Sequence, residues 1–219
     1  EIRLSLVGSE MCIRDSYNAV HDALYAGNDS CTSPLIQEIC NLILAKRQFA
    51  KSIITYNFDD VMERAMDNVG IKNYSIFGMN QPQQAFPIYH VHGFIPYDNS
   101  QIIKSVPILS EEEYHRVYAN SYNWSNVEQI HALSRRTCIF IGLSMTDPNL
   151  RRLLDIAIRD SENEARHFVF LPHITKFKNA NKKNNEAMRI HKEIFLELGL
   201  RVIWYTDYNE LPTLISQLK

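Results

Sequence analysis

The sequence predicts an α/β fold in which helices cover both faces of a mostly parallel sheet. Two observations support this prediction. Short runs of β-branched and aromatic residues alternate along the chain with stretches of helical spacing, and strands that alternate with helices form parallel sheets. The run at residues 138–141 is apolar throughout, as expected for a strand that is buried on both faces.

Composition and charge narrow the class of protein. The 219 residues are 45% hydrophobic and 22% charged, which suits one globular domain with a substantial core. The net charge is −2 and the basic residues are scattered, so no nucleic-acid partner is expected. The apolar runs are too short to cross a bilayer and no secretory signal is visible, so no membrane partner is expected. The four cysteines form no Cys-x-x-Cys pair, which argues against a zinc ribbon and favours a reducing, cytoplasmic setting.

The first 16 residues are set apart from the rest of the chain. Residues 4–16 resemble a translated sequencing-library adapter, so residues 1–16 are interpreted as an artefact and residues 17–219 as the domain. The alternative is a genuine first strand at residues 2–7. Under the artefact interpretation, the domain is truncated at its N-terminus.

The elements follow from local patterns. Start signals are clear at Ser33-Pro34, at Ser110 with Glu113, and at Asp147-Pro148. A solvated loop is expected at 176–185. On the helix at 124–135, the expected core face is Trp124, Val127, Ile130, His131 and Leu133. Helices are expected at 17–25, 34–47, 61–70, 111–118, 124–135, from 148, 186–198 and 209–218, and strands at 52–56, 74–77, within 86–96, 106–109, 138–141, 167–171 and 201–205.

The strand-to-helix connection at residues 52–66 is the first candidate binding site. Ligands of open α/β sheets bind at the carboxyl ends of the strands, so Asn57 and Asp59 are expected to project into a crevice. The structural alternative is that Asn57 turns the chain and that Asp59 or Asp60 caps the following helix.

A pair of histidines follows in the run at 86–96. Side chains alternate along a strand, so His90 and His92 are expected to share one face, and Gly93 marks a strand end or a close approach. One of them could overhang the crevice of Asn57. A metal site is disfavoured because no carboxylate or cysteine follows at ligand spacing. The other alternative is an imidazole hydrogen-bonded inside a buried strand, which suits His90 better than His92.

The segment at 138–150 repeats the pattern of strand, glycine turn and helix start. Gly142 follows the apolar run, and Asp147 can cap the helix that Pro148 begins. Such a turn presents backbone N–H groups to phosphate or ribose oxygens.

Taken in order, the segments Thr55–Asp59, His92–Gly93 and Gly142–Asn149 resemble the sirtuin-like family, in its bacterial branch that lacks the zinc module and occurs in antiviral defence proteins. The resemblance implies a Rossmann-like fold that binds NAD or a related nucleotide without a metal. It implies that Asn57 and His92 are catalytic. The cofactor-binding residues that it implies are Thr55, Asp59, Gly142, Ser144 and Asp147.

The implied reaction is hydrolysis of NAD to nicotinamide and ADP-ribose. Cleavage of the ribose–nicotinamide bond builds positive charge on the sugar, which an amide or acid oxygen can stabilise, while a histidine accepts a proton. Two alternatives stay open, a non-catalytic module for nucleotide sensing or assembly and an NAD-dependent protein deacylase. The absence of Cys-x-x-Cys pairs argues against the deacylase.

The chain departs from the family pattern at its start. The family begins with a strand and a glycine-rich phosphate loop, whereas no Gly-x-Gly occurs among the seven glycines here. The first strand and glycine loop are therefore expected to be missing, and this fragment is expected to be inactive although its parent is an enzyme. Self-association through an exposed sheet edge and an effector domain in the full-length parent are further expectations.

Overall fold

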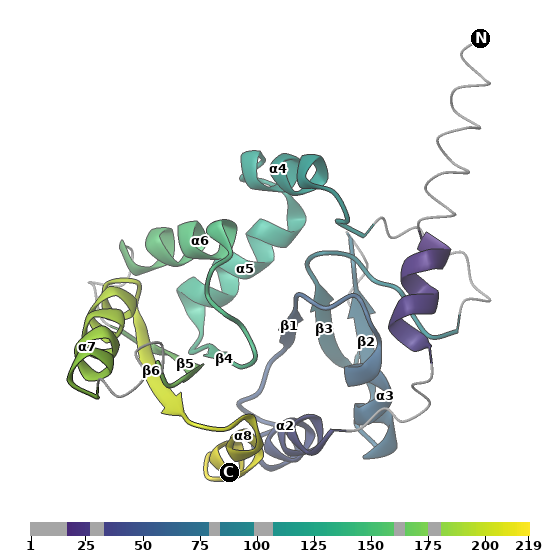
Figure 1. Cartoon of the computed structure of the whole chain (residues 1–219). Helices are drawn as coiled ribbons and strands as arrows, with labels where there is room; N and C mark the ends of the chain where they lie inside the picture. The colour runs from purple at the N-terminus through teal and green to yellow at the C-terminus, as the bar shows by residue number, and fades with distance from the viewer. Residues whose placement is uncertain (1–16, 27–32, 79–83, 99–106, 160–164, 175–180) are drawn as a thin grey trace. The chain divides into compact units, whose positions relative to one another are not determined.

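The computed structural model describes residues 17–26, 33–78, 84–98, 107–159, 165–174 and 181–219 (Figure 1). The chain divides into two compact units, Glu1–Leu109 and Ser110–Lys219. Each unit contains one three-stranded parallel sheet with helices around it, so the predicted Rossmann-like α/β class is confirmed. The adapter-like segment and the alternative strand at 2–7 lie outside the described residues.

The first unit is built on the sheet order β1-β3-β2. Its strands are β1 (Ile53–Thr55), β2 (Asn73–Ile76) and β3 (Phe86–His90). Thr55 pairs with His90, so the last residues of β1 and β3 lie side by side at the carboxyl edge of the sheet. The helices are residues 17–25, α2 (Pro34–Ala45) and α3 (Val61–Asn68).

Helices α2 and α3 form where the sequence signals predict them. Ser33 caps α2, because its side chain accepts a hydrogen bond from the Ile36 N–H, and Pro34 occupies the first turn. Their apolar faces meet the sheet in one core cluster, whose buried members are Cys40, Ile43, Ala65, Met66, Ile71 and Ile88.

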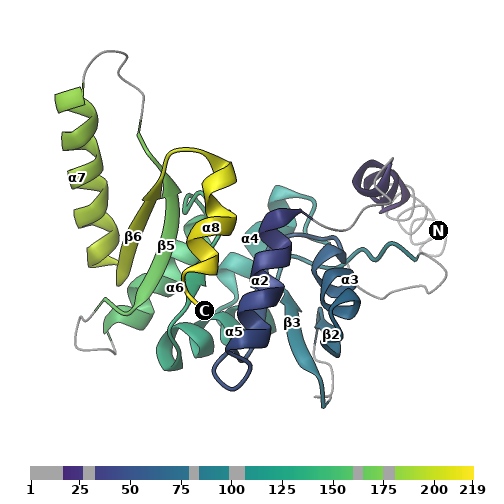
Figure 2. The same ribbon diagram turned by 90° about the horizontal axis from the view of Figure 1, so that it is seen from below.

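The second unit is built on the sheet order β4-β5-β6, with β5 (His167–Pro172) in the centre between β4 (Ile139–Phe140) and β6 (Leu200–Tyr205). Figure 2 shows β5 and β6 running side by side, with α7 next to β6. Its helical elements are α4 (Glu111–Ala119), α5 (Trp124–Arg135), α6 (Pro148–Arg159), α7 (Asn181–Glu197), the 3-10 turn η1 (Tyr208–Glu210) and α8 (Leu211–Ser216).

The core face predicted for α5 is only partly right. Leu133 is buried, but Val127 is 43% exposed and His131 is also exposed. Polar residues occupy the buried face instead, because they complete the end of the preceding helix: the Asn126 amide donates to the carbonyls of Val117 and Asn120. The buried residues of α5 are Ser125, Asn126, Gln129, Ala132 and Leu133.

Four element predictions are corrected. The run at 86–96 leaves the sheet after His90, and the described part of the 106–109 segment is not a strand. Strand β4 is two residues long and Ile139 is 41% exposed, so the expected burial on both faces is wrong; among the described residues, β4 is an edge strand that pairs with β5. Residues 181–185 belong to α7 and not to a loop, and the exposed Lys183 and Asn185 suit a solvated helix face.

None of the helices in the described ranges is long and apolar enough to cross a membrane.

His167, the first residue of β5, should make stability depend on pH. Its Nδ1 accepts a hydrogen bond from the Cys138 N–H, and burial together with the Arg166 guanidinium lowers its pKa from 6.5 to about 4. The unfolded chain therefore takes up this proton first, so the stabilising contribution is complete above pH 6.5 and declines as pH falls towards 4. We expect this residue to lower the free energy of unfolding by up to about 1.4 kcal/mol per pH unit in that window.

Denaturant unfolding of the wild type and of His167→Asn across this pH range measures the effect. The Asn oxygen can still accept from Cys138 but does not titrate, so the variant should show a shallower decline. Equal slopes in the two proteins would contradict the assignment.

Candidate functional site

Asn57 follows β1, and its backbone is fixed on both sides. Its N–H donates to Thr55 Oγ1 at 3.0 Å, and its carbonyl accepts from His90 Nδ1 at 3.2 Å. Its side chain is exposed and makes no hydrogen bond within the described part of the chain. A fixed backbone that carries an unengaged amide is the arrangement expected of a ligand-facing residue.

His90 is fully buried and hydrogen-bonded, as the structural alternative predicted for it. Its Nε2 lies 2.6 Å from Glu63 Oε1, and the Ser75 hydroxyl donates to the same oxygen at 2.8 Å. Its ring packs against Phe94 with the centroids 4.3 Å apart. The expectation that His90 and His92 share a strand face is wrong, because β3 ends at His90 and the next two residues form a turn.

His92 lies in that turn and is half-buried. Its ring meets the Tyr56 ring edge-on, with the centroids 4.7 Å apart at 85°, and its carbonyl accepts from the Ile108 N–H at 2.7 Å. Tyr56 immediately precedes Asn57 in the sequence. The turn therefore places His92 against the loop that carries Asn57.

Gly93 is required by the geometry of the same turn. Its φ is +109°, and a Cβ at this position would lie 2.4 Å from Pro107 Cα. An alanine would be strained in the backbone and would also collide with another backbone segment. The close approach that the sequence suggested for this glycine is confirmed.

The two acidic residues after Asn57, Asp59 and Asp60, make different contacts. Asp59 Oδ1 accepts from the Val61 N–H at 3.2 Å, so Asp59 caps the start of α3, in agreement with the structural alternative. Burial is the main cause that raises the pKa of the Asp59 carboxyl, and the neighbouring carboxylates of Glu63 and Asp60 add to it. Asp60 precedes α3 but makes no capping hydrogen bond with its side chain.

Asp60 instead ties three segments of the first unit together. Its carboxylate accepts from the Tyr97 N–H at 2.9 Å, from Arg64 Nε at 2.8 Å and from the Tyr25 hydroxyl at 3.2 Å. Tyr25 belongs to the helix at 17–25. The helix, the chain around Tyr97 and the start of α3 are thereby held to one buried carboxylate.

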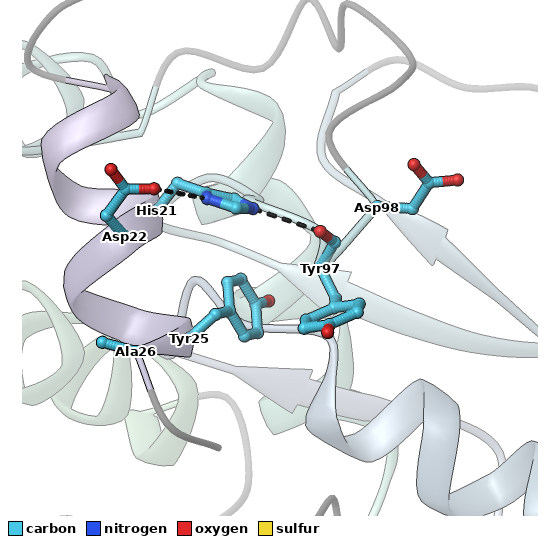
Figure 3. Close-up of a pocket in the computed structure, with 6 residues that line it drawn as sticks. All are labelled: His21, Asp22, Tyr25, Ala26, Tyr97 and Asp98. Carbon is cyan, nitrogen blue, oxygen red and sulfur yellow. Dashed lines mark hydrogen bonds and ion pairs between the residues drawn. The ribbon is translucent and has the colours of Figure 1, made fainter. Parts of the chain in front are cut away.

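An open pocket of about 640 Å³ lies beside this cluster, between the helix at 17–25 and residues 97–98 (Figure 3). Figure 3 shows His21 between Asp22 and the Tyr97 carbonyl, at 3.3 and 3.1 Å. The pocket is lined by His21, Asp22, Tyr25, Ala26, Tyr97 and Asp98, so none of the predicted site residues lines it.

The predicted turn of the second unit follows β4. Gly142 has a φ of +73°, and the exposed Ser144 hydroxyl lies 2.7 Å from Thr146 Oγ1. Met145 between them also has a positive φ, of 59°, and its side chain is buried. Burial of this side chain holds the turn in a conformation that is rare for a residue with a Cβ.

Asp147 caps α6 as predicted. Its Oδ1 accepts from the Leu150 N–H at 2.7 Å and from the Tyr114 hydroxyl at 3.2 Å. Tyr114 in turn accepts from the Asn149 N–H at 3.0 Å. This carboxylate is therefore engaged in the start of the helix.

The structure brings some of the predicted site residues together. Thr55, Asn57, Asp59 and His92 lie at the carboxyl ends of β1 and β3 in the first unit, and Gly142, Ser144 and Asp147 follow β4 in the second. Sequence reasoning missed Glu63, because nothing local signals its contact with His90, 27 residues away. Within the described ranges, no group of three or more His, Cys, Asp or Glu residues could hold a metal ion.

Parallel sheets with polar loops at the carboxyl ends of their strands place the chain in the Rossmann-like α/β class. The family model for the SIR2-like domain matches residues 51–197, and the chain belongs to this family. The sirtuin-like resemblance of the sequence is confirmed.

Two curated relatives carry the same name. The chain is 25% identical over 181 residues to NAD(+) hydrolase ThsA of Enterococcus faecium, which covers 75% of this chain and 37% of that protein. It is 23% identical over 214 residues to NAD(+) hydrolase ThsA of Acinetobacter baumannii (strain 532279), which covers 88% of this chain and 42% of that protein. The chain therefore spans less than half the length of either relative.

Gly93→Ala should destabilise the protein more than Gly70→Ala. Both glycines have a positive φ, which costs an alanine about 1–3 kcal/mol, but a Cβ at position 70 meets nothing within 4 Å. The collision with Pro107 adds to the cost at position 93 only. Denaturant unfolding of the two variants tests this ranking, which equal losses would contradict.

Asp147→Ala should cost about 1 kcal/mol of stability through the lost helix cap, with Asp147→Ser as the control that retains an acceptor.

Asn57→Ala should change stability by less than about 0.5 kcal/mol, because no described contact of its side chain is lost. Thermal melts of the three variants measure this. A larger loss for Asn57→Ala would mean that Asn57 serves the fold and not a ligand.

Proposed function

We propose that this domain, within its full-length protein, hydrolyses NAD to nicotinamide and ADP-ribose. The observation that carries the proposal is the Asn57 amide, exposed on a backbone fixed at both its N–H and its carbonyl, with His92 on the adjoining turn. Membership of the SIR2-like family and the two relatives named NAD(+) hydrolase support it.

In the proposed reaction, water attacks the ribose carbon that carries nicotinamide. The carbon–nitrogen bond breaks, its electron pair neutralises the pyridinium ring, and the proton of the water passes to a base. His92 is the proposed base, because imidazole accepts protons near neutral pH. The Asn57 side-chain oxygen would orient the water and stabilise the positive charge that develops on the ribose.

The cofactor-binding roles are proposed for the remaining residues. Thr55 and Asp59 flank Asn57, and a carboxylate oxygen of Asp59 could accept a hydrogen bond from the carboxamide nitrogen. Gly142, Ser144 and Asp147 would form the turn that meets the ribose and phosphates. The exposed backbone of Gly142 and the exposed hydroxyl of Ser144 suit that role.

No metal takes part in the proposed step, because water, an amide and an imidazole suffice for it. A role of this activity in antiviral defence, in the cytoplasm, is proposed from the family branch that the sequence resembles.

His92→Ala in the full-length protein should reduce nicotinamide release by about 100-fold or more, since a general base contributes that much. Chromatography of nicotinamide measures the rate. His115→Ala is the matched control, because His115 is an exposed histidine on α4 that should leave the rate unchanged. Undiminished turnover by His92→Ala would remove His92 from the mechanism.

The same assay separates the alternatives. A wild-type protein that binds NAD without releasing nicotinamide would be a nucleotide sensor or an assembly module. Release that requires an added acyl-lysine peptide would identify a deacylase. Either result would overturn the proposed hydrolysis.

A further inference from the structure

His90 occupies a position in which both of its ring nitrogens meet oxygen atoms. Nδ1 lies 3.2 Å from the Asn57 carbonyl and Nε2 lies 2.6 Å from Glu63 Oε1, and the ring is fully buried. A carbonyl oxygen can only accept, so Nδ1 carries a proton and donates to Asn57. The tautomer is therefore set by the contact with Asn57.

Glu63 holds the other side of this ring. Its Oε1 accepts from the Ser75 hydroxyl as well as facing His90, and its Oε2 is buried without a partner in the described part of the chain. One further proton lies between Nε2 and Oε1, either on the ring or on the carboxyl group. In both cases the pair has no net charge, and the ring cannot turn without breaking a buried hydrogen bond.

The contact with Asn57 is one of the long-range links of the loop after β1; the Phe58 carbonyl also accepts from the Ile95 N–H at 2.7 Å. The Asn57 N–H is bound by Thr55, two residues away, whereas His90 reaches the Asn57 carbonyl from 33 residues away. The carbonyl orientation sets the peptide plane between Asn57 and Phe58 and hence the direction of the Asn57 side chain. The backbone carbonyl of His90 also accepts from the Gly93 N–H at 3.2 Å, within the turn that presents His92.

We propose that His90 and Glu63 form a positioning pair that aims the Asn57 amide, and the turn of His92, at the substrate of the site. The inference rests on the proposed NAD hydrolysis. Neither residue touches the reacting atoms. Each acts through the loop that carries Asn57, so loss of the pair should lower kcat far more than it changes KM.

Two substitutions at His90 each retain one of the two contacts of its ring. In His90→Asn the amide nitrogen takes about the place of Nδ1 and can still donate to the Asn57 carbonyl. In His90→Gln the amide nitrogen takes about the place of Nε2 and keeps the contact with Glu63 but loses Asn57. A purely structural role predicts that activity follows the melting temperature in both variants.

We expect His90→Gln to lose kcat by on the order of tenfold or more relative to His90→Asn, with similar KM values, when nicotinamide release by the full-length protein is measured. Thermal melts of both variants supply the stability comparison. Equal kcat losses, or losses that follow the melting temperatures, would overturn the positioning role.

A second pair of substitutions leaves His90 in place and decides the question if both His90 variants fail to fold. Glu63→Gln can donate its amide to Nε2 while Nδ1 keeps its proton, so it should retain most of the wild-type kcat. Glu63→Met has a similar length and no partner for the ring, so kcat should fall at constant KM. Equal kcat in these two variants would overturn the inference.

The wild type in the same assay separates a failure of the proposed NAD hydrolysis from a failure of the positioning role. A wild-type protein that releases no nicotinamide would overturn the proposed function and the positioning role with it. Release by the wild type together with equal kcat in the matched variants would overturn the positioning role alone.

Discussion

The buried carboxylate of Asp60 is the contact on which the first unit depends. It receives a backbone N–H, a guanidinium and a phenol from three separate segments, those of Tyr97, Arg64 and Tyr25. A buried carboxylate is costly unless such donors surround it, so loss of any one donor should weaken the hold on the other segments. The Arg64 guanidinium also lies 4.8 Å from the centre of the Tyr97 ring, which adds a cation–π contact to the same cluster.

The N-terminal end of α3 concentrates negative charge. Asp59, Asp60 and Glu63 lie within its first turn or just before it, and their mutual repulsion contributes to the raised pKa of Asp59. The positive end of the helix dipole offsets part of this repulsion. Arg64 also offsets part of it, because its guanidinium Nε lies 2.8 Å from Asp60 Oδ1. Of these acids, Glu63 also contacts His90, whose ring in turn contacts the Asn57 carbonyl.

The loops that follow the strands are held by different contacts in the two units. In the first, long-range hydrogen bonds from His90 and a close approach at Gly93 fix the loops after β1 and β3. In the second, the turn after β4 combines a local cap with tertiary contacts: Asp147 caps the helix that follows and accepts from the Tyr114 hydroxyl, and the burial of Met145 holds a positive φ. The loop of Asn57 therefore depends mainly on tertiary contacts, whereas the turn after β4 depends on both local and tertiary ones.

The sequence by itself determined the strand-to-helix connections, the caps at Ser33, Ser110 and Asp147, and the family, because these signals act between residues a few positions apart. It failed on the shared face of His90 and His92, since the end of a strand depends on pairing with its neighbours. Only the tertiary structure decided that His90 is buried against Glu63 and the Asn57 carbonyl, contacts that span 27 and 33 residues. Such contacts leave no local pattern, because they depend on which elements the sheet brings side by side.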